Sequence, residues 1–152
     1  MKKIAILVIS IFIAHSAIAA TSDEEQKNVQ SFVNSAVAFF QDKGQDYSIK
    51  AFNALHGPFV KGPLYVFLGT LDGRILAHPF SKALLEKNQL GLTDSNGKLF
   101  FKEMISTVEN QGEGWVDYVW PYPGSQKIMK KRCFVKRIPS QDTWIGAGFY
   151  IE

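Results

Sequence analysis

One lysine of this 152-residue chain falls in a position where a charge would be costly. Residues 128–138 alternate in polarity, which predicts a strand whose successive side chains point to opposite faces. The neighbours of Lys131 on its own face are apolar, namely Met129, Cys133 and Val135. A buried ammonium needs a partner, and the carboxylate of a small ligand would supply one. Alternatively, Lys131 lies near the strand end and extends its ammonium into water.

Three further side chains are candidates to complete a ligand-binding site with Lys131: Tyr118, Trp120 and His78. Tyr118 and Trp120 share one face of a predicted strand, and their apolar bodies with polar tips suit a small pocket. His78 ends another predicted strand just before Pro79, and it could donate a hydrogen bond to a ligand oxygen. The alternatives are plain core packing for the two aromatic residues and a turn-capping role for His78, with Asp94 or a backbone carbonyl as its partner.

Other chemistries have little support in the sequence. A single cysteine, Cys133, excludes an intramolecular disulfide and a cysteine-cluster zinc site, and no pair of histidines has metal-ligand spacing. There is no G-x-S-x-G elbow, P-loop or dinucleotide glycine fingerprint. We therefore expect no metal, no cofactor and no enzymatic activity. The basic run in residues 127–137 is interpreted as the solvated face of a strand, without a role in nucleic-acid binding.

The N-terminus has the pattern of a secretory signal peptide. Lys2 and Lys3 precede the apolar run 4–14, and Ala17-Ile18-Ala19 offers small residues for cleavage. Residues 1–19 are therefore predicted to be removed on export to the periplasm, the alternative being an uncleaved membrane anchor. Without the two lysines, 15 of the 17 basic residues remain beside 14 acidic ones, which argues against a generally basic surface.

Residues 20–152 are predicted to form one domain of the α+β class. Helical spacing of apolar residues indicates a long helix that begins at Thr21-Ser22-Asp23 and closes near Gly44. Further elements follow in chain order: a helix over 47–55, strands 64–68 and 74–77, helices 82–87 and 99–108, and strands 115–120, 128–138 and 144–151. Hairpin turns, such as that at Asp72-Gly73, favour an antiparallel sheet with the long helix on one face.

Several short motifs, in this order and spacing, resemble the single Cache family of extracytoplasmic PAS-like sensor domains. They are Leu71-Asp72-Gly73, Ala77-His78-Pro79, the segments 91–97, 112–121 and 131–136, and Trp144-Ile145-Gly146-Ala147-Gly148-Phe149-Tyr150. The resemblance implies a five-stranded antiparallel sheet with the long N-terminal helix packed behind it. It also implies a ligand pocket on the other face, roofed by the crossover between the second and third strands.

Members of the family typically sense small carboxylates, most of them as the outer part of a transmembrane receptor. The resemblance therefore implies a small organic acid as ligand of this chain. Because the sequence shows no membrane helix after the domain, we expect a separate membrane receptor or kinase as partner. The alternative is a periplasmic interaction or structural module that has the same fold and binds no ligand.

Overall fold

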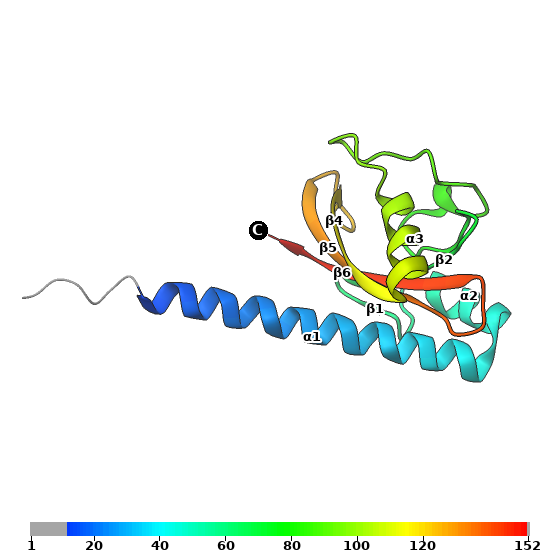
Figure 1. The fold of residues 1–152 in the computed structure, drawn as a ribbon, viewed down its shortest axis with the longest axis horizontal. Helices are drawn as coiled ribbons and strands as arrows, with labels where there is room; N and C mark the ends of the chain where they lie inside the picture. Colours follow the sequence, from blue (N-terminus) through cyan, green and yellow to red (C-terminus); the bar gives the residue numbers. More distant parts are fainter. Residues whose placement is uncertain (1–11, 152) are drawn as a thin grey trace, which may run out of the picture.

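The computed structural model describes residues 12–151, with side chains from Ser22 onward (Figure 1). The helices are α1 (Phe12–Lys43), α2 (Gln45–Asn53) and α3 (Phe100–Gln111), with one 3₁₀ turn at Lys82–Leu84. The strands are β1 (Val60–Lys61), β2 (Leu64–Thr70), β3 (Ile75–Ala77), β4 (Glu113–Pro121), β5 (Ile128–Arg137) and β6 (Thr143–Ile151).

The long helix α1 begins earlier than the sequence predicted. Thr21-Ser22-Asp23 lies inside α1 and does not cap it, because the alanine-rich residues before it form helix readily and contain no glycine or proline. The helix closes at Gly44, whose φ of +79° suits glycine. Residues 1–11 of the predicted leader lie outside the described part of the chain. Within residues 12–151, no helix has both the length and the apolar character needed to cross a membrane.

The strands form one antiparallel sheet in the order β1-β2-β6-β5-β4, with β3 also paired to β2. The five predicted strands are β2 to β6, and the two-residue β1 adds a short extension to β2. Helix α1 runs along one face of the sheet and α3 lies on the other side (Figure 1). The expected α+β architecture, with a long helix on an antiparallel sheet, is therefore confirmed.

Each face of the sheet has its own core. On the α1 face, Phe32, Val33, Ala36, Phe52, Val66, Leu68, Phe134 and Ile145 are among the buried residues. On the α3 face the core includes Tyr65, Phe67, Phe100, Met104, Val116, Tyr118, Cys133 and Trp144. Alternation along β5 explains the division: Phe134 packs toward α1, whereas Cys133 and Val135 pack toward α3.

Two aromatic rings on the α3 face lie flat over glycines of the neighbouring strand. Phe67 on β2 is paired with Gly146 on β6, where an added Cβ would come within 2.5 Å of the ring. Trp144 lies in the same way over Gly69, where an added Cβ would come within 2.6 Å of the indole ring. Only glycine allows rings to lie so close to the sheet. At these two positions the side-chain layer on the α3 face of the sheet is therefore thinner than it would be if the rings stood upright.

Candidate functional site

Lys131 points from β5 into the α3 face and is fully buried, with 0% of its surface exposed. Its Nζ lies 3.9 Å from the centre of the Tyr65 ring, 5.0 Å from that of Tyr150 and 5.9 Å from that of Phe67. Among the described residues, Nζ has neither a hydrogen-bond acceptor nor a carboxylate within ion-pair distance. Lys131 thus does not reach water, and within the described part of the chain the aromatic rings are its only nearby electrostatic support.

Two more polar atoms beside Lys131 are buried without a partner. The hydroxyl of Tyr65 and Nδ1 of His78 form no hydrogen bond with the described part of the chain. The two rings meet edge to face, with centroids 5.0 Å apart. Buried polar groups are nearly always hydrogen-bonded in folded proteins, so three unsatisfied groups in one cluster mark a place where an outside molecule could bind.

The two predicted aromatic residues lie in the same cluster. Trp120 is half-buried, with its ring centroid 6.2 Å from that of His78 and 6.1 Å from that of Tyr118. Tyr118 is the cross-strand partner of Lys131 and stacks in parallel on Phe100 of α3 at 4.6 Å. All four residues singled out from the sequence therefore converge on one region, with Tyr65 at its centre.

Burial shifts the pKa values in this cluster toward the uncharged forms. The pKa of Lys131 falls to about 8 because its ammonium is desolvated. Desolvation, with a smaller effect from the nearby Lys131, lowers the pKa of His78 to about 3, so this imidazole is neutral at physiological pH. Burial also raises the phenol pKa values of Tyr65 and Tyr118 well above their usual range. Near neutral pH, Lys131 is the one charged member of the group.

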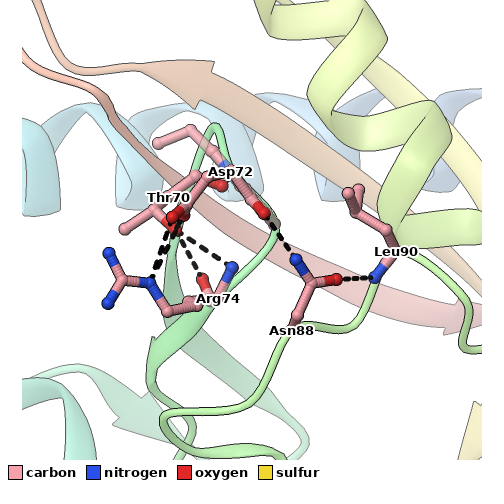
Figure 2. Close-up of polar contacts among 6 residues, drawn as sticks. Thr70, Asp72, Arg74, Asn88 and Leu90 are labelled. Atoms are coloured by element: carbon pink, nitrogen blue, oxygen red, sulfur yellow. Dashed lines mark hydrogen bonds and ion pairs between the residues drawn. The ribbon is translucent and has the colours of Figure 1, made fainter.

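The crossover between β3 and α3 forms a roof, and side chains help to fix it to the sheet at two points besides its backbone bonds to Gly73 and Ile75. Figure 2 shows the first of these, at the hairpin between β2 and β3. Nδ2 of Asn88 donates to the carbonyl of Asp72 at 2.8 Å, and Oδ1 of Asn88 accepts from the backbone N–H of Leu90 at 3.0 Å. Thr70 and Arg74 brace the same turn through bonds to Asp72 and to each other.

The second point is Asp94, which ties the roof to the edge of β4. One carboxylate oxygen accepts from the backbone N–H groups of Asn96 and Lys98, both at 2.9 Å, and the other accepts from Val119 N–H at 3.0 Å. Burial disfavours ionisation of Asp94, but these three donors hold its pKa below the usual value. Asp94 is therefore fully engaged by backbone groups, and no bond to His78 is formed.

Tyr65, Tyr150 and Asn53 are residues of this site that sequence reasoning missed. Tyr65 belongs to the apolar part of β2, residues 64–68, which is largely buried on both faces, and its hydroxyl is the only side-chain polar group of that run. Asn53, at the end of α2, accepts the backbone N–H of His78 through Oδ1 at 2.9 Å. This bond holds the end of β3, and with it the position of the imidazole. Nothing in the local sequence indicates a contact across 25 residues.

Other predicted features lie elsewhere. Of the basic run, Arg132 and Lys136 point away from the α3 face and pair with Asp117 and Glu113 at 2.7 and 2.6 Å. Their pairing fits the interpretation as a solvated face. Within the described residues, no three histidine, cysteine, aspartate or glutamate side chains are grouped as metal ligands. A depression of about 690 Å³ beside the β2–β3 hairpin, lined in part by Arg74 and Asp142, does not reach the Lys131 cluster.

Comparison with known proteins agrees with the geometry. The family model described as Cache domain matches residues 13–152, nearly the whole chain. The chain belongs to the Cache family. The resemblance read from the sequence motifs is thus confirmed, and with it the class of module: an extracytoplasmic sensor domain of the kind found in chemoreceptors and sensor kinases.

This Cache domain also has a recognisable relative among characterised kinases. The sensor histidine kinase MctS of Rhizobium johnstonii (strain DSM 114642 / LMG 32736 / 3841) is 31% identical over 88 residues. The match covers 58% of this chain and 19% of the kinase, so the chain spans only a small part of that relative.

Solved structures resemble the Cache domain over most of its length. The periplasmic sensor domain of a chemotaxis protein is 27% identical with a TM-score of 0.67, over 94% of this chain and 100% of that one. A methyl-accepting chemotaxis protein from Vibrio parahaemolyticus RIMD 2210633 shares 18% identity with a TM-score of 0.76, over 88% and 93%. A Cache chemosensory domain described for its carboxylic acid recognition shares 23% identity with a TM-score of 0.74, over 91% and 98%. At 18% and 23% identity, the likeness concerns the fold alone.

Proposed function

We propose that this Cache domain binds a small carboxylate in the cluster around Lys131. The observation that carries the proposal is the fully buried ammonium, which has no anionic partner among the described residues. A buried, unpaired cation destabilises a fold, and its retention is explained if a ligand anion pairs with it. The structural relative described for carboxylic acid recognition supports the same ligand class.

Each residue of the cluster has a role in the proposal. Lys131 pairs with the ligand carboxylate, while the Tyr65 hydroxyl and Nδ1 of His78 supply hydrogen bonds that are otherwise unmade. Tyr118 and Trp120 form the apolar wall beside the carbon chain of the ligand. A site of this kind binds and orients its ligand, and the proposal assigns it no catalytic step.

In the cell, the domain acts outside the cytoplasm as a sensor. The leader over residues 1–19 directs export, and its removal leaves residues 20–152 in the periplasm. A separate membrane receptor or kinase then receives the ligand-bound domain. The kinase and chemoreceptor relatives support this assignment to signal transduction.

The size of the ligand limits its affinity. Acetate has four heavy atoms, so a ceiling of about −1.5 kcal/mol per atom allows roughly −6 kcal/mol. This corresponds to a dissociation constant no tighter than on the order of tens of micromolar.

The proposal is tested by calorimetry and thermal denaturation with propionate and with propionamide, which has the same shape but no charge. Propionate is expected to bind and to raise the melting temperature, because it stabilises only the folded state. Propionamide is expected to bind at least about 30-fold more weakly, since it leaves Lys131 unpaired. If acids of two to four carbons neither release heat nor shift the melting temperature, the carboxylate proposal is wrong.

A further inference from the structure

Lys131 alone sets the charge of the site, and this has a consequence beyond the proposed function on which it rests. We propose that a bound monocarboxylate and the protonated side chain of Lys131 form a pair with no net charge, which we call the neutral pair. Under this arrangement dianions are refused, and in alkaline solution each binding event takes up a proton.

The groups that face Lys131 come from five elements, and none of the others carries a charge near neutral pH. They are Tyr65 on β2, His78 at the end of β3, Tyr118 on β4, Cys133 on β5 and Tyr150 on β6. Burial raises the pKa values of Cys133 and Tyr150 to about 12 and those of Tyr65 and Tyr118 well above the usual range. The pKa of His78 is about 3.

Helix α3 adds no charge to the site, and the buried carboxylate of the roof, Asp94, forms no ion pair with Lys131. Helix α3 turns Phe100, Phe101 and Met104 toward the sheet, while its ionisable residues Lys102, Glu103 and Glu109 are exposed. On the roof, the buried carboxylate of Asp94 is engaged by three backbone N–H groups. The site therefore offers one positive charge to a ligand, and only while Lys131 is protonated.

A dianion would bring a second charge that this site cannot balance. One carboxylate would pair with Lys131, and the other would be desolvated among aromatic rings without a cation. Neutral Tyr65 and His78 can give hydrogen bonds but no compensating charge. We expect malonate to bind at least about 100-fold more weakly than propionate, which has the same number of carbon atoms.

Proton uptake follows from the same balance. Burial lowers the pKa of Lys131 to about 8 in the free site, and a bound carboxylate restores the charged form. Above pH 8, binding must therefore bring a proton to Lys131, and affinity should fall about tenfold per pH unit. Between pH 7 and 9.5 the expected loss of propionate affinity is about 30-fold, although propionate itself stays ionised throughout.

The test is calorimetry of propionate binding to the protein at pH 8.5 in two buffers of different ionisation enthalpy. The dependence of the heat on the buffer should correspond to uptake of about 0.7 proton per propionate, and to less than about 0.1 at pH 6.5. A Lys130→Met variant serves as control, because Lys130 is exposed on the opposite face and its loss should leave the uptake unchanged.

The possible results separate the two proposals. Binding at pH 6.5 with no proton uptake at pH 8.5, or malonate binding as tightly as propionate, would overturn the neutral-pair proposal and leave the carboxylate site intact. Absence of propionate, acetate and pyruvate binding at pH 6.5 would overturn the carboxylate site and the neutral pair with it.

Discussion

The two faces of the sheet are both buried but satisfy their polar groups in different ways. The α1 face is packed by aliphatic and aromatic side chains, among them the edge-to-face pair Phe52 and Phe59 at 4.7 Å. The α3 face buries a similar set of aromatic residues, but Lys131, His78 and Tyr65 lie among them with unsatisfied polar atoms. The proposed ligand site therefore belongs to the α3 face alone, and substitutions on the α1 face can separate stability from affinity.

The largest expected effect is on the α1 face. Phe52→Ala removes a fully buried ring from the contact with Phe59, and it should lower the free energy of unfolding by about 3–5 kcal/mol. The dissociation constant for propionate, measured well below the melting temperature, should change less than about twofold. Denaturant unfolding and calorimetry would check both values. A large loss of propionate affinity in the folded variant would contradict the assignment of the ligand site to the α3 face alone.

The α3 face should reveal its buried cation in the pH dependence of stability. The pKa of Lys131 is about 8 in the folded chain and near 10.5 when exposed, so between these values the unfolded chain binds more protons. Stability therefore rises with pH in this window, by about 2–3 kcal/mol up to pH 10. Above pH 10, ionisation of tyrosines in the unfolded chain opposes the rise. Denaturant unfolding at several pH values should show the rise in the wild type and not in Lys131→Met.

Adjacent lysines on opposite faces of β5 give a matched pair for binding. Lys131→Met removes the charge and keeps the stem length, so propionate should bind about 30- to 150-fold more weakly, a loss of at least about 2–3 kcal/mol. The unliganded fold should be unchanged or more stable. The exposed Lys130→Met should change either quantity by less than about 1 kcal/mol. Equal, small effects at both positions, measured by calorimetry, would remove Lys131 from the site.

The smallest expected effect concerns the roof. Asp94→Asn replaces one of the oxygens that accept backbone N–H groups with a donor, which should lower the free energy of unfolding by about 1–2 kcal/mol. Asp117→Asn, at an exposed pair with Arg132, is the control and should cost less than about 1 kcal/mol. Hydrogen exchange at the Val119 amide should rise only in the Asp94 variant. Equal exchange in both variants would show that Asp94 does not hold the roof.

The sequence predicted most of the fold because polarity alternates along strands such as β5, part of whose outer face is exposed. On β5 the apolar neighbours of Lys131 were enough to indicate that it points inward. The same signal failed on β2, which is buried on both sides, so Tyr65 could not be distinguished from the core residues around it. Asn53 and Asp94 bind backbone groups 25 residues away, and local sequence patterns do not predict such contacts.

The glycine beneath Phe67 separates the shape of the site from its charge. Phe67 lies 5.9 Å from both the Lys131 ammonium and the His78 ring, so in the proposed site the height of this ring over β6 would limit the length of the bound carbon chain. A methyl group at Gly146 would tilt this ring upward without touching any group that pairs with a carboxylate. In a duplicated gene, one such substitution would shorten the acid that fits while preserving recognition of its head group. Sensors for acids of different length could then diverge through a substitution at Gly146 on β6, the strand next to the one that carries Lys131.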